Sequence, residues 1–318
     1  MMRRGVMQKY RILFVFVGIC ILLSVLTPVF LSVNNIINVI RQVSINGILA
    51  AGMTMVIISG GIDLSVGSVA AICGAIVAGT QLKLGLAPAM LLSVATGALL
   101  GLINGLVITK GKVAPFVATL GMTTVARGLT LIYTGGRPIY NLTDAFRVLG
   151  AGYVGPIPVP VLILALVIAV VHFVMSSTVF GREVYALGGN EEAARYSGIN
   201  VERRRMLVYI SMGLLSAVTG IVLTSRLGSA DPTAGVGFET DAIAAVVIGG
   251  TSMSGGEGSV IGSLIGALII GVMNNGLNLL NVSPYYQQIF KGLIVVLAVL
   301  MDSASRRKRQ AAALKVGR

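Results

Sequence analysis

Long runs of apolar residues, broken by glycine, proline and charged residues, dominate this chain. Several runs extend for about 20 residues without a polar face, which is the length that a helix needs to cross a hydrocarbon core. The mean hydropathy is +0.92 and only 11% of the residues are charged, whereas a soluble domain has roughly 25% charged residues. The runs predict an all-α, polytopic membrane protein of about ten transmembrane helices, at 12–31, 36–58, 66–81, 88–109, 113–134, 158–175, 206–224, 242–251, 259–280 and 289–301.

Positive charge is concentrated between and beyond the apolar runs. The net charge is +13, but Lys and Arg form no stripe with interleaved aromatic residues, so we do not expect nucleic acid as a partner. Membrane lipid explains the charge better, because cations gather on the cytoplasmic side of a bilayer. We therefore expect an inner-membrane protein with both termini in the cytoplasm. Its single transmembrane domain, 1–318, has a cytoplasmic N-terminal tail at 1–11, a cytoplasmic loop at 176–205 and a basic cytoplasmic tail at 302–318.

The sequence offers little for catalysis, redox chemistry or metal binding. Cys20 and Cys73 lie inside apolar runs without metal-ligand spacing, and His172 is the only histidine. The string at 105–113 imitates a phosphate-binding loop, but it ends in valine where a hydroxyl should hold Mg²⁺. We expect no catalytic site, metal or bound cofactor in this chain. If ATP and Mg²⁺ drive its activity, another chain must bind them.

Two glycine-rich strings resemble each other. VIISGGIDLSVGSV covers 56–69, VVIGGTSMSGGEGSV covers 246–260, and the GSV at 67–69 matches the GSV at 258–260. A glycine pair inside the membrane breaks a helix, and the freed backbone groups persist only where protein or a water-filled cavity satisfies them. The pattern favours a Gly-interrupted internal repeat whose broken helices line a transport pathway. The alternative is a chance likeness among glycines that merely allow close helix packing.

Asp63 is the acid that lies most clearly inside the membrane. Asp63 and Ser65 follow the first glycine pair, where either side chain can accept hydrogen bonds from the free N–H groups of the next helix. The structural interpretation is therefore a helix cap. The functional interpretation is that an acid, costing about 2.5–3.5 kcal/mol inside a membrane, binds substrate hydroxyl groups or controls a gate. Both residues are candidates for the substrate pathway.

Four asparagines add neutral polar groups to the apolar runs. Asn104 lies in the fourth run and Asn274, Asn275 and Asn278 lie in the ninth, where 274 and 278 are one helical turn apart. Because an amide both donates and accepts hydrogen bonds, these side chains can replace the water around a neutral polar cargo. Equally, asparagine amides can join neighbouring helices, at about 0.6–2 kcal/mol each. Arg127, in the fifth run, is expected either to face a cavity or, more commonly for such a residue, to reach toward an outside loop.

The loop at 176–205 contains a short helix signal. Asn190 can cap a helix that begins with EEAA at 191–194, and Gly198 can end it. Its charged and small side chains suit a helix that docks into a groove on a soluble partner. A solvated connector would have a similar composition.

Three longer strings are specific enough to suggest a family. They are GMTMVIISGGIDLSVGS at 52–68, ALGGNEEAARYSGINV at 186–201 and the stretch at 229–287. From about residue 34 onward the chain resembles the permeases of bacterial ATP-binding-cassette importers for ribose and related monosaccharides. The resemblance implies a transport subunit, without its own ATPase site, that translocates a small sugar such as ribose. Members of the family carry ribose, xylose, allose, galactose, arabinose or a furanosyl signalling molecule.

The resemblance also implies partners. Permeases of this family form homodimers, work with a soluble ATPase of two fused nucleotide-binding domains, and receive sugar from a periplasmic or lipid-anchored binding protein. By resemblance, Glu192, Ala193, Ala194 and Gly198 form the element that couples the permease to the ATPase. The Ile-x-Leu-Pro sequence that usually completes this element is missing here, which leaves the docking contacts open.

Three other classes of membrane protein are alternatives. An ion-coupled secondary transporter needs titratable groups inside the membrane, where Asp63 is the clear candidate because Glu239 and Asp241 are expected at a boundary. A passive channel does not need a docking helix, and a membrane enzyme needs a catalytic constellation that we do not find in the sequence. Neighbouring genes for an ATPase and a secreted binding protein would separate these classes from an importer.

Overall fold

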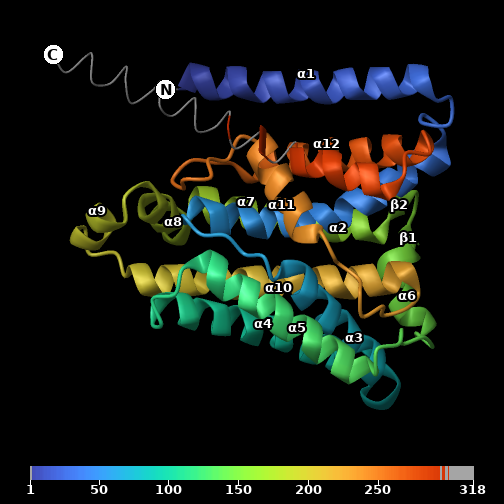
Figure 1. Cartoon of the computed structure of the whole chain (residues 1–318), viewed down its shortest axis with the longest axis horizontal. Coiled ribbons are helices and arrows are strands. Elements are labelled where there is room, and N and C mark those ends of the chain that lie inside the picture. The colour runs from blue at the N-terminus through green and yellow to red at the C-terminus, as the bar shows by residue number, and fades with distance from the viewer. Residues whose placement is uncertain (1, 294–295, 298–299, 301–318) are drawn as a thin grey trace.

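The computed structural model is built from helices that run roughly parallel to one another across the view in Figure 1. It describes residues 2–293, 296–297 and 300, with side chains from residue 13 onward. The named helices are α1 (Met2–Leu26), α2 (Val33–Ile58), α3 (Val66–Leu84), α4 (Leu86–Thr109), α5 (Pro115–Thr134), α6 (Asp144–Ala151), α7 (Val159–Ser177), α8 (Val179–Gly189), α9 (Glu191–Tyr196), α10 (Val201–Leu227), α11 (Phe238–Ile248) and α12 (Val260–Leu279). Residues 284–293 are helical as well. Two short strands, β1 (Tyr153–Val154) and β2 (Ile157–Pro158), pair in an antiparallel hairpin.

The polytopic helical fold is confirmed. Within the described part of the chain, seven helices are long and apolar enough to cross a membrane, namely α2, α3, α4, α5, α7, α10 and α12. Each coincides with a predicted run, while α1 contains a shorter apolar stretch at Leu13–Leu26. With 11 residues, α11 is about 16 Å long, roughly half the thickness of a hydrocarbon core. The run at 289–301 lies partly, and the tail at 302–318 wholly, outside the described residues, so ten crossings stay a prediction.

Helices α2 and α10 form the centre of the bundle. Helix α2 packs against α7, α10, α11 and α12, and α10 packs against α3 and α4. Every residue of α2 from 43 to 58 is buried. A helix that is apolar all round can be buried on every side, which explains why this stretch occupies the middle of the molecule. Its C-terminal end therefore lies among protein groups rather than lipid.

Glycines let α4 and α10 approach closely. A Cβ atom on Gly97 would collide with the carbonyl oxygen of Gly213, and a Cβ on Gly213 would collide with that of Gly97. One turn along α4, a Cβ on Gly101 would collide with the carbonyl oxygen of Tyr209. Small residues allow such backbone contact between transmembrane helices, where no hydrophobic force drives the association. Close packing therefore explains these three glycines, which lie outside the two glycine-rich strings.

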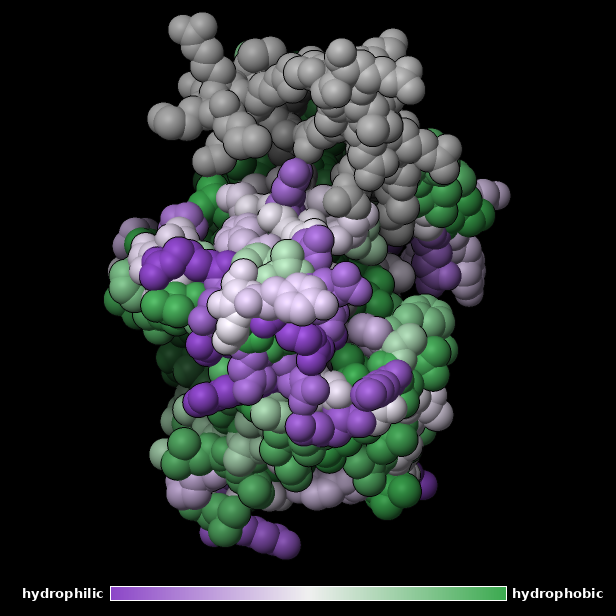
Figure 2. All heavy atoms as spheres, turned by 90° about the vertical axis from the view of Figure 1, so that its left-hand side faces the viewer, coloured by the Kyte–Doolittle hydropathy of each residue, from purple (hydrophilic) through white to green (hydrophobic). Residues whose placement is uncertain are grey.

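One end of the bundle is polar. The predicted loop at 176–205 is largely helical, since it contains α8, α9 and the first turn of α10. Helix α10 begins at Val201 because the Asn200 side chain accepts a hydrogen bond from the Arg203 N–H at 3.0 Å. Figure 2 faces this end and shows hydrophilic side chains in its middle with hydrophobic ones beside and below them. This distribution is typical of a protein surface that emerges from a bilayer.

The opposite end is closed by α6 and the hairpin of β1 and β2, as Figure 1 shows. No element was predicted between 135 and 157. Thr143 starts α6 by accepting a hydrogen bond from the N–H of Phe146 at 3.4 Å. Beside this end, the Arg127 guanidinium of α5 donates hydrogen bonds to the carbonyl oxygens of Pro232 and Ala234 in the loop before α11. Arg127 therefore contacts a connecting loop and also lines a second cavity, and the location of this loop outside the membrane stays a prediction.

Candidate functional site

The first broken helix ends at the predicted glycine pair. Helix α2 stops at Ile58, and Gly60 adopts a φ of +80°. The N–H of Gly60 donates to the carbonyl oxygen of Ile57 at 2.9 Å, and the N–H of Gly61 donates to that of Val56 at 3.0 Å. These two bonds form a Schellman-type helix end, in which glycine is favoured because other residues rarely adopt positive φ.

The second glycine pair ends α11 in the same way. Gly250 adopts a φ of +86°. Its N–H donates to the carbonyl oxygen of Val247 at 2.9 Å, and the N–H of Thr251 donates to that of Val246 at 3.1 Å. The two helix ends therefore share a hydrogen-bond pattern as well as a sequence. Both helices stop within the protein and continue as loops that lead into α3 and α12.

The predicted match between 67–69 and 258–260 does not describe equivalent positions. Ser259 is the N-cap of α12, and its Oγ accepts a hydrogen bond from the N–H of Gly262 at 3.3 Å. Ser68, in contrast, lies inside α3, whose N-cap is Ser65. The loop between α2 and α3 is shorter than the loop between α11 and α12. The two GSV sequences therefore lie at different positions relative to the start of the following helix. The internal repeat itself stays a prediction.

Asp63 lies in the loop between α2 and α3 and is only 2% exposed. Its Oδ1 accepts hydrogen bonds from the backbone N–H of Ser65 at 2.8 Å and from the Ser65 hydroxyl at 2.6 Å. Ser65 is itself the N-cap residue of α3, and its side chain makes no capping hydrogen bond. The predicted cap is therefore wrong in detail. Asp63 closes an Asx-type turn that fixes the chain just before the helix.

Ser65 also connects Asp63 to α4. The amide nitrogen of Asn104, a residue only 2% exposed, donates a hydrogen bond to the Ser65 hydroxyl at 3.0 Å. The hydroxyl thus accepts from Asn104 and donates to Asp63, so the three side chains form one buried chain of hydrogen bonds. From α10, the Tyr209 hydroxyl donates to the carbonyl oxygen of Ile62 in the same loop at 3.2 Å. Side chains from two other helices therefore hold the first broken helix in place.

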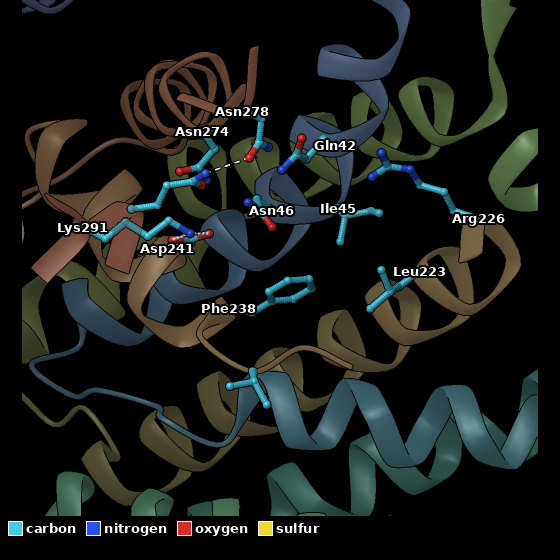
Figure 3. A pocket seen from close by; sticks show the side chains of 12 residues that line it. Gln42, Ile45, Asn46, Leu223, Arg226, Phe238, Asp241, Asn274, Asn278 and Lys291 are labelled. Atoms are coloured by element: carbon cyan, nitrogen blue, oxygen red, sulfur yellow. Dashed lines mark hydrogen bonds and ion pairs between the residues drawn. The ribbon is translucent and has the colours of Figure 1, made fainter. Parts of the chain in front are cut away.

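A second group of polar residues lines a cavity of about 200 Å³ between α2, α10, α11 and α12. Asn274 and Asn278 both face it, as their spacing of one turn predicted (Figure 3). The Oδ1 atom of Asn278 accepts a hydrogen bond from Gln287 at 2.8 Å. The Oδ1 atom of Asn274 is buried and has no hydrogen-bond partner among the residues that the structure describes. Gln42 and Asn46 of α2 add two further amides to the lining.

Asn275 has different surroundings. Its side-chain amide exchanges two hydrogen bonds with Asn35 of α2, at 2.8 and 3.0 Å. This reciprocal pair joins α12 to α2, which is the structural role that we weighed for these asparagines. The six predicted pathway residues therefore separate into three places, namely the chain of Asp63, Ser65 and Asn104, the cavity with Asn274 and Asn278, and the pair that contains Asn275.

An ion pair in the cavity was not predicted. The Nζ atom of Lys291 lies 2.9 Å from Oδ1 and 3.0 Å from Oδ2 of Asp241, which is 5% exposed. Asp241 lies in the first turn of α11 and is buried within the bundle, and its position at a membrane boundary stays a prediction. The sequence contained a signal for this ion pair, namely an acid next to the apolar run at 242–251 and a lysine inside the run at 289–301. The rim also carries Arg226, from the end of α10.

Helix α9 begins and ends as predicted. The Oδ1 atom of Asn190 accepts a hydrogen bond from the N–H of Ala193 at 3.0 Å, which caps the helix. Gly198, at a φ of +83°, follows its end, and the N–H of Gly198 donates to the carbonyl oxygen of Arg195 at 3.0 Å. The helix lies at the tip of the polar end in Figure 1. It is therefore a defined helix rather than an irregular connector.

The side chains of α9 separate into two sets. Ala194 is 4% exposed and packs into a small apolar cluster under the helix. Glu192 and Ala193 are exposed. Tyr196 is 91% exposed, which is unusual for so large an aromatic residue, and sequence reasoning did not single it out. The outward surface of α9 thus combines a carboxylate, a small residue and an aromatic ring.

Two hydrogen bonds to Glu191 anchor α9. Arg205 donates to its Oε2 at 2.7 Å, and Arg195, one turn away, donates to Oε1 at 3.4 Å. The Arg205 hydrogen bond is the largest cause that lowers the pKa of the Glu191 carboxyl group. Because Arg205 belongs to α10, this contact ties the short helix to a long one. The outward surface of α9 is therefore held on a rigid support.

The end of α8 touches both broken helices. A Cβ atom on Gly188 would collide with the carbonyl oxygen of Ile58 and would lie 2.7 Å from the nitrogen of Gly256. The N–H of Gly256 donates to that same carbonyl oxygen at 2.9 Å. We call this contact of Gly188, Ile58 and Gly256 the glycine junction. Nearby, the Tyr185 hydroxyl of α8 donates to the carbonyl oxygen of Gly258 at 2.9 Å.

Comparison with known proteins identifies the family. The model of a family described as branched-chain amino acid transport system / permease component matches residues 35–299. The chain belongs to this permease family. The ribose import permease protein of Bacillus subtilis is 52% identical over 94% of both chains. That of Haemophilus influenzae is 51% identical over 91% of this chain and 92% of its own. The D-allose transport system permease protein of Escherichia coli is 40% identical, over 93% and 91%. No solved structure matches the chain.

Family membership confirms the resemblance that the three long strings suggested. The family is described as a permease component and its relatives as import permeases, so the chain is a transport subunit rather than an enzyme. Together with the seven apolar helices, it describes a multi-pass protein of the inner membrane. The matched residues include both broken helices, the cavity and α9. All the candidate sites described above therefore lie within the permease.

Proposed function

We propose that this chain is the membrane-spanning permease subunit of an ATP-binding-cassette importer for ribose or a closely related monosaccharide. The 52% identity to a ribose import permease, across 94% of both chains, carries the proposal. Relatives named for ribose and allose favour a sugar over the branched-chain amino acids of the family description. The buried amides of Asn104 and Asn274 support a neutral polar cargo, because they can exchange hydrogen bonds with hydroxyl groups.

The importer includes three further kinds of subunit. A soluble ATPase with two fused nucleotide-binding domains binds ATP and Mg²⁺, a second permease copy completes a homodimer, and a periplasmic or lipid-anchored protein delivers the sugar. The exposed surface of α9 supports docking of the ATPase, since Glu192 and Tyr196 project from it. The cationic residues around this end support a cytoplasmic location, with both chain termini on the same side.

The glycine junction supports a route from the ATPase to the sugar pathway. Helix α9 follows α8 after one residue, and the end of α8 touches Ile58 and Gly256 through backbone atoms. Packed backbones resist compression, so a movement of α8 has to displace both loops together. One of these loops carries Asp63, whose hydrogen bonds hold it against α4 through Asn104. A movement of the ATPase would thus shift the end of α2 and the loop between α11 and α12 together.

Sugar uptake by cells tests this proposal. In a strain without its own ribose permease, the chain is expressed with the ATPase and binding protein encoded beside it, and uptake of labelled D-ribose is measured. We expect saturable uptake that unlabelled D-ribose abolishes and that requires the ATPase gene. Uptake of a furanosyl signalling molecule but not of ribose would assign another cargo. Uptake that persists without the ATPase would favour an ion-coupled secondary transporter.

A further inference from the structure

We propose that the cavity between α2, α10, α11 and α12 is a binding site for a neutral polyol of pentose size within a single permease copy. The inference rests on the proposed function, because it names where the permease itself holds the sugar. Three features of the cavity support it: the buried Asn274 oxygen without a hydrogen-bond partner among the described residues, a carboxylate whose charge is balanced by a lysine, and a size that fits a monosaccharide.

The cavity lies away from the polar end of the bundle. Arg226 lies at the C-terminal end of α10, whose first turn is beside α9. Asn278 likewise lies at the C-terminal end of α12, whose N-terminus follows the loop that contains Gly256. If α9 faces the cytoplasm, the cavity is in the outer half of the membrane. A sugar released from a binding protein outside the cell would reach this half first.

One buried oxygen atom in the cavity lacks a hydrogen bond among the residues that the structure describes. It is Oδ1 of Asn274, a residue only 4% exposed, whereas Oδ1 of Asp241 lies 2.9 Å from Nζ of Lys291. Leaving a buried acceptor unpaired is unfavourable, so native proteins rarely tolerate it without a ligand or water. A hydroxyl group of a polyol is a donor that can satisfy this atom. Figure 3 shows Asn274 and Asp241 on neighbouring helices, facing the same space.

The ion pair keeps the Asp241 side of the cavity neutral. Lys291 forms a hydrogen bond to Oδ2 of Asp241, while its contact with Oδ1 at 2.9 Å is an ion pair without hydrogen-bond geometry. The carboxylate charge is therefore balanced, yet Oδ1 can still accept from a ligand hydroxyl group. A free cation would be repelled by Lys291. Arg226 at the rim offers N–H donors for the oxygen atoms of the same ligand.

The remaining lining suits a sugar ring. The Phe238 ring and the Leu223 side chain lie opposite the amides in Figure 3 and supply an apolar wall for the C–H groups of a pyranose or furanose. The cavity has a volume of about 200 Å³ and is open on one side, so a monosaccharide is a suitable ligand by size. A lipid tail is a poor fit, because most of the lining is polar.

Equilibrium binding to the full-length permease tests the proposal. Purified chain in lipid nanodiscs is titrated with labelled D-ribose, D-xylose and D-allose in the absence of the ATPase and the binding protein. We expect saturable binding of at least one sugar, weakened about tenfold by Asn274→Leu through the loss of its hydrogen bonds. Gln42→Leu, at the cavity rim, is a second variant that is expected to weaken binding should Asn274→Leu fold poorly.

Gln81→Leu is the matched control. Gln81 lies on α3, away from the cavity, and its side chain is a buried amide that is 2% exposed. Its Oε1 atom accepts a hydrogen bond from the Thr143 hydroxyl at 2.8 Å. Its replacement should leave sugar affinity unchanged, and thermal unfolding of every variant checks that the protein is folded. Absence of saturable binding by the wild-type chain would overturn the proposal. So would unchanged affinity in folded Asn274→Leu and Gln42→Leu proteins.

Two further arms separate the possible failures. D-ribose 5-phosphate is titrated as an anionic probe, and stronger binding of this probe than of ribose would overturn the assignment of a neutral ligand, since Arg226 would then dominate recognition. Uptake by the complete transporter is measured in parallel. Normal ribose uptake together with no ribose binding by the permease would reject the cavity site alone. Absence of uptake of any sugar by the complete transporter would reject the proposed function itself.

Discussion

The backbone N–H of Gly256 donates a hydrogen bond to the carbonyl oxygen of Ile58 at 2.9 Å, and so joins the loop before α12 to the end of α2. Gly188 of α8 lies against both groups and has no room for a side chain. The three residues come from segments far apart in the sequence. This contact places α8, the helix that precedes α9, directly on the end of α2 and on the loop between α11 and α12.

The first prediction concerns the glycine junction. Gly188→Ala should strongly reduce sugar uptake and cost about 1–3 kcal/mol of stability, because overpacking forces the backbones of α8 and α2 apart. Gly189→Ala is a matched control, since a Cβ on Gly189 would meet nothing within 4 Å. Uptake and membrane level of the two variants are compared at equal expression. Normal uptake by Gly188→Ala would show that coupling does not pass through this contact.

The second prediction concerns Asp63. Asp63→Asn keeps an Oδ1 acceptor for the N–H and hydroxyl groups of Ser65, so we expect near-normal membrane level and transport. Asp63→Ala leaves both donors without this partner, which should cost about 1–3 kcal/mol and lower the amount of protein in the membrane. Quantitative blotting and uptake assays measure the two effects separately. A well-expressed but inactive Asp63→Asn protein would instead assign a role to the negative charge.

The third prediction concerns the outward surface of α9. Tyr196→Ser should weaken binding of the ATPase by about 2 kcal/mol, because exposed tyrosines often anchor protein interfaces. Glu192→Lys should also abolish coupling by reversing a charge at the interface. Pull-down of the ATPase and uptake are measured together. Glu202→Gln is the control, since it disrupts only an exposed ion pair with Lys110. Unchanged ATPase binding in both α9 variants would move the docking site elsewhere.

Gly198 provides a fourth prediction. Its φ of +83° and its N–H bond to Arg195 are both incompatible with proline, whose φ is fixed near −65° and which has no N–H. Gly198→Pro should therefore disrupt the end of α9 and abolish uptake, while insertion into the membrane continues normally. Protease protection of the membrane domain checks insertion. Full uptake by this variant would indicate that the geometry of α9 is not needed for coupling.

The fifth prediction uses pH to test the anchor of α9. Hydrogen bonding to Arg205 lowers the pKa of Glu191 in the folded protein, so its stabilising contribution is present above the ordinary pKa and is lost as pH falls through the lowered value. The Glu191 side chain is 43% exposed, which limits the contribution to less than about 1 kcal/mol. Thermal unfolding should thus separate wild type from Glu191→Gln at pH 7, and the difference should shrink as the pH falls below the ordinary pKa of a glutamate and through the lowered pKa of Glu191. A constant difference would exclude titration of Glu191 as its cause.

The long helices could be predicted from the sequence because a bilayer demands runs of about 20 apolar residues. The start of α3 at Val66 and the ends of α4 at Thr109 and α5 at Thr134 agree with the predicted boundaries. Helix α8 was missed, since its glycines and charges have the composition of a loop. Its helical form depends on tertiary contacts, in which Val184 and Leu187 are buried against the rest of the chain.

The candidate site could be predicted only in part. The ends of α2 and α11 and the cap at Asn190 could be predicted, because helix capping depends on residues that are adjacent in the sequence. The surroundings of Asn274 and Asn275 do not, because neighbouring positions on one helix face different partners once the bundle packs. The pairing of Asp241 with Lys291 joins residues 50 positions apart, and only the folded arrangement brings them together.

The most direct test of the central claim is transport by a reconstituted importer. The purified chain and its ATPase are placed in proteoliposomes with ATP inside and the sugar-binding protein and labelled D-ribose outside. We predict accumulation of ribose that requires ATP, the ATPase and the binding protein, and no ATP hydrolysis by the permease alone. Accumulation driven by a proton or sodium gradient without the ATPase, or hydrolysis of ATP by the isolated chain, would contradict the account.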